Sequence, residues 1–435
     1  MPDPTIFISA GEASGEHSGA LLIAALQKRL QAQGQRAAFV GMGGPRMVAA
    51  GLERVVRAED MAVMGIAEIV WHLPSIYRGY RKLKSSIRAR RPDVAVLIDF
   101  PDIHFKLAEQ FHRLGIPVIF FVSPQLWAWK KHRLKLVQKY VDKMLVIFPF
   151  EEQFYRERGV HAEFVGHPLA ELGMPAVTRN DYAKQAASIH QDQWRYVPPS
   201  ARPPSGTVWT NGKISYELDP DKEWIALLPG SRMPEILWNL RTMVDAAVLL
   251  GNGYEYIIPI APTLSERQIR VLQYEMGDLY LPDHPPRITF VRDARAALFH
   301  ARVSIVASGT ATVDAALIGN PFVVVYRVSP ITYAIAKRIV TVPHVAMANL
   351  IAGRRVVPEL IQNEFTAANI VQQIKPLLPD GPPRESMKQE LKRIRTLLST
   401  GPRGQGDASG AIDRVAAITL ERLGIPSPVA ESVQS

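Results

Sequence analysis

Short apolar runs that end in glycine, proline or aspartate alternate along the chain with longer segments of helical periodicity. In the N-terminal part, these runs cover residues 5–10, 36–44, 93–100, 116–124 and 142–148. Near-continuous apolar strands that alternate with helices form parallel sheets covered on both faces. The pattern therefore predicts a doubly wound α/β domain in this part of the chain.

The same alternation returns further along, after a region in which it is lost. Residues 175–222 are rich in proline, serine and glycine and show no period, which indicates a linker with an insertion. A second set of apolar runs covers residues 223–231, 254–261, 287–293, 301–309 and 321–328. Helical patterns follow at residues 366–378, 384–398 and 408–423.

The predicted fold is α/β, with two facing Rossmann-like doubly wound domains and a helical C-terminal tail. The first domain, the linker with its insertion, the second domain and the tail are expected at residues 1–170, 171–222, 223–365 and 366–435. Ligands of such sheets bind at the carboxyl ends of the strands. Candidate functional residues should therefore directly follow the apolar runs.

The composition narrows the function classes. The 435 residues include no cysteine, which excludes disulfides, thiolate metal sites and cysteine nucleophiles. A formal net charge of +10 favours an anionic partner, although a solvated basic surface would give the same balance. The N-terminus MPDPTIFISA lacks the features of a secretory signal, and no apolar run approaches the ~20 residues that span a bilayer. We expect a cytoplasmic or peripheral protein that does not bind nucleic acid, because its basic stretches lack interleaved aromatic platforms.

The first apolar run leads into the glycine-rich segment ISAGEASGEHSGA, residues 8–20. Glycines at a strand-to-helix turn let a ligand approach the backbone, and a helix N-terminus favours an anion. The spacing matches neither the dinucleotide fingerprint nor a P-loop, so a tight structural turn is also a simple interpretation. The polar residues Glu12, Glu16 and His17 on this turn favour a function.

Two acids follow the third apolar run, in LIDFPDIHF. A carboxylate at the carboxyl end of a strand, such as Asp99 or Asp102, can act as a general base or bind a hydroxyl group. Asp102 also suits the N-cap of the helix that follows. The next run leads to Trp127 and Trp129, which are compatible with aromatic packing, sugar stacking or an interface.

Two turns of the second α/β block suit a diphosphate. Arg232 in LLPGSR follows a strand at a helix start, where its guanidinium can bind a phosphate in a bidentate manner. Ser308, Gly309 and Thr310 combine two hydroxyls, a glycine and free N–H groups at another helix start. Asp314, one turn further on, could bond a ribose hydroxyl or complement the helix dipole.

Metal chemistry has weak support in the sequence. The Asp-x-Asp motif of Asp219 and Asp221 lies in the linker and does not follow an apolar strand. We therefore predict no metal site and no cofactor. A nucleotide-diphosphate leaving group would then need arginine and helix N-termini to take its charge.

Residues 61–91 join an apolar stretch to a basic one. The residues expected to contact acyl chains or the membrane are Ile66, Ile69, Val70, Leu73, Arg78, Arg81 and Lys82. An apolar patch beside a basic cluster is typical of a membrane-interface element, and each Lys or Arg near an anionic leaflet contributes ~1 kcal/mol. A core helix followed by a solvated basic helix fits the same pattern.

Taken together, the motifs resemble those of the lipid-A-disaccharide synthase family. The matching segments, in order over about residues 5–365, are ISAGEASGEHSGA, FVGMGGPRM, MGIAEI, LIDFPDIHF, FVSPQLWAW, FVGHPL, LLPGSR, ASGTATVDAAL and ANLIAGRRVVPEL. The resemblance implies a GT-B glycosyltransferase fold and an inverting, metal-independent transfer of 2,3-diacylglucosamine from UDP to the 6-hydroxyl of 2,3-diacylglucosamine 1-phosphate. The products would be UDP and a β-1,6-linked disaccharide 1-phosphate. It also implies a peripheral location on the cytoplasmic face of the inner membrane, and it suggests a homodimer.

Roles for individual residues follow from the resemblance. Asp102 is expected to deprotonate the acceptor hydroxyl, with Glu12 and Glu16 as the next candidates for catalysis. Arg232 and residues 308–310 are expected to hold the diphosphate, and Asp314 to contact the ribose. The substrate-binding residues implied are Gly11, Ser14, Gly15, Arg232, Ser308, Gly309, Thr310, Asp314 and Asn349.

This sequence departs from the family pattern at two of these positions. Glu16 stands where the family commonly has Asp, and Asp314 stands where it commonly has Glu. Both changes keep the charge and alter the reach by one methylene. Two other interpretations stay open: a different UDP-sugar enzyme on the same fold, such as a muramyl-peptide N-acetylglucosaminyltransferase or a 2-epimerase, and a non-catalytic membrane-associated binding protein.

Overall fold

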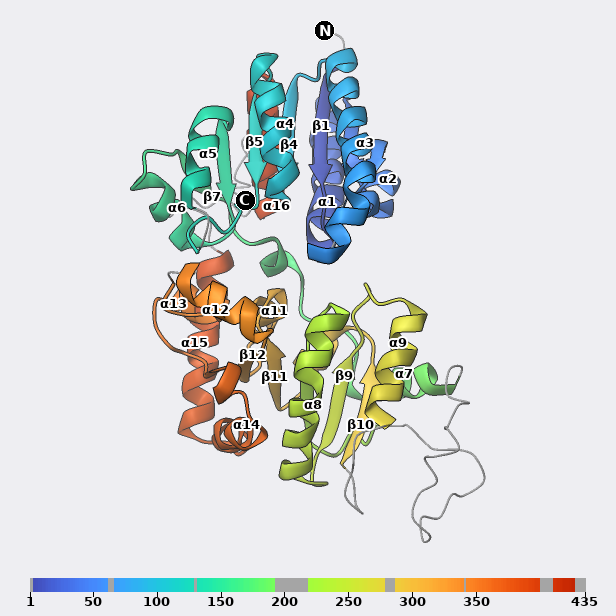
Figure 1. Cartoon of the computed structure of the whole chain (residues 1–435), viewed down its shortest axis with the longest axis vertical. Helices are drawn as coiled ribbons and strands as arrows, with labels where there is room; N and C mark the ends of the chain where they lie inside the picture. The colour runs from blue at the N-terminus through green and yellow to red at the C-terminus, as the bar shows by residue number, and fades with distance from the viewer. Residues whose placement is uncertain are drawn as a thin grey trace, which may run out of the picture. The chain divides into compact units, whose positions relative to one another are not determined.

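The computed structural model describes residues 3–61, 66–128, 131–191, 218–277, 286–339, 342–399 and 410–426. The chain divides into two compact units, one of Met1–Glu171 with Leu397–Ser435 and one of Leu172–Thr396. Each unit contains one parallel sheet with helices packed against it (Figure 1). The predicted α/β class with two doubly wound sheets is confirmed.

The first unit has a seven-stranded sheet in the order β3-β2-β1-β4-β5-β6-β7. Its strands are β1 Thr5–Ala10, β2 Ala38–Gly43, β3 Leu52–Arg57, β4 Val94–Ile98, β5 Val118–Phe121, β6 Lys143–Val146 and β7 Ala162–Phe164. Its helices are α1 Ala13–Ala32, α2 Pro45–Ala49, α3 Ile66–Arg90, α4 Pro101–Arg113, α5 Leu134–Tyr140, α6 Pro149–Arg156 and α16 Ala411–Arg422. All residues of β4 and β5 are buried, which explains their unbroken apolar sequences.

The second unit has a six-stranded sheet in the order β10-β9-β8-β11-β12-β13. Its strands are β8 Trp224–Leu228, β9 Glu255–Pro259, β10 Arg287–Val291, β11 Val303–Ala307, β12 Phe322–Tyr326 and β13 Glu359–Ile361. Its helices are α7 Arg179–Gln191, α8 Met233–Leu250, α9 Glu266–Gly277, α10 Ala294–His300, α11 Thr310–Ile318, α12 Pro330–Ile339, α13 Met347–Ala352, α14 Ala367–Ile374 and α15 Pro382–Ser399.

The apolar runs did not predict three edge strands, β3, β7 and β13. β3 lies at one edge of the first sheet and β7 at the other, and β13 lies at an edge of the second. β3 has three exposed residues among its six, and β7 and β13 are three residues long. The exposed positions of β3 and the shortness of β7 and β13 leave no long apolar run in these strands.

The glycine-rich segment after β1 is helical almost from its start. α1 begins at Ala13, so Ser14, Gly15 and Glu16 form its first turn. A side chain at Gly19 would lie 2.8 Å from the sulfur of Met47. The glycines of this segment therefore allow close packing inside a helix, and the loop itself is short.

The predicted linker also contains a helix that its composition did not reveal. In α7, Arg179 donates hydrogen bonds to three backbone carbonyls of the second unit, and its guanidinium carbon lies 3.9 Å from the ring centroid of Trp224. α7 is therefore part of the second unit. Residues 192–217 of the predicted insertion lie outside the described residues.

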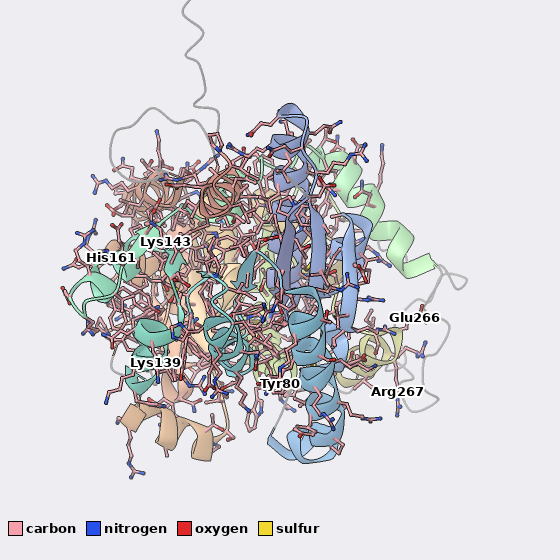
Figure 2. The ribbon with its side chains drawn as sticks, turned by 90° about the horizontal axis from the view of Figure 1, so that it is seen from above. Tyr80, Lys139, Lys143, His161, Glu266 and Arg267 are labelled. Atoms are coloured by element: carbon pink, nitrogen blue, oxygen red, sulfur yellow. The ribbon has the colours of Figure 1, made fainter. Side chains whose placement is uncertain are left out.

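The C-terminal helices were predicted at the right places, but they belong to different units. α14 and most of α15 lie in the second unit, and α16 lies in the first. Lys143, labelled in Figure 2, and Arg414 of α16 both pair with Glu163, at 2.6 and 3.6 Å. The Arg414 pair joins α16 to the edge strand β7, and the Lys143 pair joins β7 to its neighbour β6.

Candidate active site

The polar turns of the first unit lie where its strand order reverses. β1 and β4 are neighbours, but the chain runs from β1 toward one edge of the sheet and from β4 toward the other. Such a switch point is the usual ligand site of a doubly wound sheet. Gly11 and Glu12 follow β1, and Asp99 and Phe100 follow β4. A side chain at Gly11 would overlap the ring of Phe100, so only glycine fits there.

Asp99 is the acid that this switch point encloses. Its backbone has a φ of +52°, and that of Phe100 has a φ of +51°. Residues other than glycine seldom adopt this left-handed backbone conformation. Burial and, to a lesser extent, the nearby charge of Glu12 raise the pKa of Asp99 to about 6, although the hydrogen bond from the N–H of Phe100 opposes both effects. A carboxyl group that titrates near neutral pH at a strand end suits a general base.

Asp102, the predicted base, has a different environment. Its side chain is 67% exposed and forms an ion pair with Arg133 in the segment before α5. Asp102 lies in the first turn of α4, but the N-cap position is held by Phe100, so the interpretation of Asp102 as an N-cap is wrong. Proton abstraction is better supported by the partly buried carboxyl group of Asp99, with its raised pKa, than by one paired with arginine at the surface. The geometry therefore favours Asp99 over Asp102.

The residues of the first turn of α1 have separate roles. Glu12 is the exposed N-cap residue of α1, next to Asp99. The Glu16 carboxylate accepts a hydrogen bond from the N–H of Arg46 at 2.7 Å, at the start of α2, and a side chain at Gly44 would overlap that carboxylate. Glu16 thus anchors α2, and its predicted catalytic role stays a prediction.

Ser14 and Gly15 differ in exposure. Ser14 is exposed, and its carbonyl accepts a hydrogen bond from Ser18 at 3.2 Å. Gly15 is buried, and a side chain there would lie 3.6 Å from Ala10 and Ile98. Gly15 therefore packs against the strand ends, while Ser14 is accessible to a substrate.

In the second unit, the first polar turn follows β8 at the start of α8. Gly230 has a φ of +130°, and a side chain there would lie 2.5 Å from the carboxyl group of Glu235. That carboxyl group accepts from the N–H of Ser231 at 3.2 Å, and its burial raises its pKa. Arg232 is the exposed N-cap residue of α8, so its guanidinium is accessible to an anion.

The second polar turn of this unit follows β11, which neighbours β8 at the second switch point. Ser308 donates to the carbonyl of Val345 at 3.3 Å. Gly309, with a φ of +154°, has no other atom within 4 Å of the position of a side chain, and Thr310 is exposed at the first position of α11. The turn therefore has room and N–H groups for an anion.

Asp314, the predicted ribose contact, has an ion-pair partner within the protein. Its carboxylate forms an ion pair with Arg295 of α10 at 2.5 Å. Burial raises the pKa of Asp314, and the charge of Arg295 opposes that shift. The observed contact links α10 to α11.

Asn349 is fully buried, and its side chain is saturated with hydrogen bonds. Its amide donates to Glu359 at 2.7 Å and to the carbonyl of Val357 at 2.9 Å, and its oxygen accepts from the N–H groups of Val356 and Val357. With its side-chain donors and acceptors used within the protein, Asn349 shapes the segment around α13, and its predicted substrate contact stays a prediction.

Glu359 connects this segment to the turn after β11. Its carboxylate accepts from the N–H groups of Val345 and Ala346, at 3.2 and 2.9 Å. The carbonyl of the same Val345 receives the hydroxyl of Ser308. Asn349 and Glu359 therefore act on the predicted phosphate turn through the backbone.

The Asp-x-Asp motif of the linker forms a turn. Asp219 accepts from the N–H of Asp221 at 3.0 Å, and its carbonyl accepts from the indole of Trp224 at 2.8 Å. Within the parts of the chain that the structure describes, no three His, Asp or Glu side chains gather as they would to hold a metal ion.

Sequence reasoning missed two buried polar residues of the first unit, His104 and Glu151. His104 bridges Ser9 and the backbone of Asp99. Glu151 accepts from the indole of Trp127 at 3.0 Å, and burial raises its pKa to about 8. The sequence signal for each was a titratable residue on an otherwise apolar helix face. Trp127 is buried in this contact, and Trp129 lies outside the described residues.

Residues 66–90 of the predicted membrane segment form one helix, α3, with Pro74 inside it, and residues 62–65 lie outside the described residues. In its C-terminal half, Leu83 and Ile87 are buried while Arg78, Arg81 and Lys82 are exposed. The side chains of Ile66, Ile69, Val70 and Leu73 lie outside those that the structure describes. Among the described residues, no helix has the length and apolarity needed to cross a membrane.

Solved structures with the same architecture identify the fold class of the chain. A kitacinnamycin glycosyltransferase matches with a TM-score of 0.56 at 16% identity, over 97% of this chain and 100% of that one. Acinetobacter baumannii MurG matches with a TM-score of 0.52 at 15% identity, over 97% and 100%. The fold is that of the GT-B glycosyltransferases.

Sequence comparison defines the family. A family model described as lipid-A-disaccharide synthetase matches residues 6–200 and 207–405. The lipid-A-disaccharide synthase of Acidobacterium capsulatum is 55% identical over 97% of this chain and 96% of its own length, and that of Koribacter versatilis is 45% identical over 96% and 99%. The chain belongs to the lipid-A-disaccharide synthase family.

Proposed function

We propose that this chain is an inverting, metal-independent lipid-A-disaccharide synthase. It transfers 2,3-diacylglucosamine from UDP-2,3-diacylglucosamine to the 6-hydroxyl of 2,3-diacylglucosamine 1-phosphate and releases UDP. The 55% identity to a synthase over nearly the whole chain carries this proposal. The polar turns at both switch points support it, because a transferase needs a base and a diphosphate site.

In this proposal, Asp99 is the base of the first unit. Its carboxylate takes the proton of the acceptor hydroxyl, and the oxygen attacks the anomeric carbon while the bond from that carbon to the diphosphate breaks. Attack opposite the leaving group converts the α-linked donor into a β-linked product. The pKa of Asp99, raised to about 6, leaves it ionised at neutral pH and basic enough to accept a proton.

The second unit holds the donor's diphosphate in this proposal. Arg232 and the N–H groups at the starts of α8 and α11 take the negative charge of the departing UDP. Ser308, Gly309 and Thr310 form the turn at α11, and Asn349 and Glu359 hold the segment that this turn contacts. The ribose contact of Asp314 would require it to share its carboxylate with Arg295.

A transfer assay tests the proposal. The purified protein is incubated in detergent with the two acylated substrates and a chelator, and UDP and the disaccharide phosphate are detected by mass spectrometry. Both products should appear in the presence of the chelator. Turnover of UDP-N-acetylglucosamine without transfer from the acylated donor would instead favour another UDP-sugar enzyme on this fold, and products that vanish with the chelator would contradict metal independence.

Peripheral attachment to the cytoplasmic face of the inner membrane is the second part of the proposal. The exposed cations Arg78, Arg81 and Lys82 on one helix support it, since each contributes about 1 kcal/mol near an anionic leaflet. Replacing all three by glutamate should abolish sedimentation with vesicles of anionic phospholipid. The matched control replaces Arg241, Lys375 and Lys392, which are exposed on the second unit, and should still sediment. Equal loss in both variants would show that net charge alone is responsible.

The family resemblance also suggests a homodimer, and we propose one. Sedimentation velocity of the purified protein should then give about twice the chain mass of 48.4 kDa. A single species at the chain mass would contradict it.

A further inference from the structure

A buried serine–histidine pair lies beneath Asp99. Ser9 of β1 and His104 of α4 are both fully buried, and the Ser9 hydroxyl lies 2.8 Å from Nε2 of His104. Nδ1 of the same imidazole lies 2.5 Å from the backbone carbonyl of Asp99. The imidazole therefore links β1 to the residue that follows β4.

The proton positions in this chain of contacts follow from its chemistry. Burial lowers the pKa of His104 to about 4, so the imidazole is neutral at neutral pH and carries one N–H. The carbonyl of Asp99 can only accept, so Nδ1 donates to it, and Nε2 accepts from the hydroxyl of Ser9. Each polar group of the pair is satisfied.

The contact fixes a backbone conformation that is otherwise unfavourable. Asp99 and Phe100 both have a positive φ, and residues held in that region need support from their surroundings. The N–H of Asp99 donates to the carbonyl of Phe121 at 2.9 Å, and its carbonyl accepts from His104. The peptide groups on both sides of the Asp99 side chain are therefore held.

Core packing alone does not account for the pair. The other buried residues of α4 near it, Ile103, Phe105 and Leu107, are apolar, and apolar side chains of similar shape would avoid desolvating a hydroxyl and an imidazole. The imidazole supplies what an apolar residue could not, which is a donor for the Asp99 carbonyl.

We propose that Ser9 and His104 are positioning residues that hold Asp99 in the orientation needed to accept the acceptor's proton; this rests on the proposed function with Asp99 as its base. Among the residues that the structure describes, the titratable groups that face Asp99 are Glu12, from the turn after β1, and His104 itself, from α4. Loss of the donor should let the turn relax and expose the carboxyl group of Asp99 to water.

The test is the pH dependence of transfer in matched variants. In His104→Ala, kcat should fall about 10- to 100-fold, as expected for a displaced reacting group, while KM for the UDP donor changes little. The acid limb of the kcat profile should move to lower pH, because a more solvated carboxyl group loses its proton more readily. His104→Asn, whose amide can donate in place of Nδ1, should restore most of kcat and the position of the limb.

Two further variants separate positioning from general stability. Ser9→Ala should move the acid limb in the same direction as His104→Ala, by a smaller amount. His167→Asn replaces another buried histidine of the first unit, whose ring accepts from the N–H of Leu169 at 3.1 Å, and should leave the limb in place. Thermal unfolding of each variant reports the cost to stability.

Three outcomes overturn the inference. A folded His104→Ala protein with the wild-type kcat and acid limb would do so. If His104→Ala does not fold, an unmoved limb in Ser9→Ala would do so instead. Absence of transfer by the wild-type protein would overturn the proposed function and this inference together, whereas normal transfer with unmoved limbs overturns the inference alone.

Discussion

The side-chain amide of Asn349 donates a hydrogen bond to the carboxylate of Glu359 over 2.7 Å, and both side chains are buried. The pair holds the backbone of Val345, whose carbonyl receives the hydroxyl of Ser308. Asn349, which was predicted to contact the donor, is therefore bonded to the segment that Ser308 contacts. An effect of Asn349 on donor binding through this segment can be measured.

Asn349→Ala should lower the free energy of unfolding by about 3 kcal/mol, because it leaves several buried polar groups without partners. It should also weaken UDP binding, since the turn at Ser308 loses its support. Urea unfolding and titration calorimetry with UDP measure the two effects. Asn320→Ala is the control: its amide bonds Ser304 and the carbonyl of Ala301, so it should lose stability and retain UDP affinity. Equal loss of affinity in both variants would contradict the assigned role.

Arg232→Ala should weaken UDP binding about 10- to 100-fold, which is the usual worth of a hydrogen bond between charged groups. The matched control, Arg241→Ala, removes an exposed arginine further along α8 and should bind UDP as the wild type does. Calorimetry at constant ionic strength compares the two. Unchanged affinity in Arg232→Ala would remove this residue from the diphosphate site.

The sequence was sufficient for the architecture but not for the choice between neighbouring acids. Strands such as β4 can be predicted because every residue is buried and the sequence is therefore continuously apolar. The positions of the functional turns can then be predicted as well, because ligands bind where parallel strands end. Asp99 and Asp102 follow the same strand, and the pattern of apolar and polar positions does not distinguish their environments. Their difference arises from two consecutive left-handed residues and from the pairing of Asp102 with Arg133, which depend on tertiary contacts.

The pattern of apolar and polar residues in the sequence also did not predict the hydrogen bonds of partly or fully buried polar side chains. Glu16 carries the charge expected of a catalytic acid, yet its partner is a backbone N–H of α2, thirty residues along the chain. Asn349 has the residue type of a ligand contact, but all its hydrogen bonds turn inward. Residue type and strand position predict where a site lies, whereas the role of each side chain depends on which partners the fold supplies.

Glu151→Gln should stabilise the protein increasingly as pH rises. The folded-state pKa of Glu151, about 8, lies above its ordinary value of 4.5, so the folded state retains a proton that the unfolded chain loses. The wild type should therefore lose up to roughly 1.4 kcal/mol per pH unit between about pH 4.5 and pH 8, and the variant should not. Urea unfolding at pH 5, 6.5 and 8 gives the slopes. Glu152→Gln, which removes a surface partner of Arg156, should keep the wild-type slope.

Transfer by the wild-type protein should fall as pH drops through about 6, because protonated Asp99 cannot accept the acceptor's proton. Glu12→Gln removes a negative charge that disfavours ionised Asp99, so the acid limb should shift to lower pH. The pH profile of kcat at saturating donor measures this shift. A shift to higher pH, or none, would show that Glu12 does not act on the titrating base.

The most direct test of the account compares Asp99→Asn with Asp102→Asn in the transfer assay, with thermal unfolding as the measure of intact folding and UDP binding as the measure of the donor site. We predict that Asp99→Asn lowers kcat by about 100-fold or more, as loss of a general base does, and still binds UDP. Asp102→Asn should retain most of the activity, because it removes only a surface partner of Arg133. Loss of transfer in Asp102→Asn with activity kept in Asp99→Asn would contradict the account and return the role of base to Asp102.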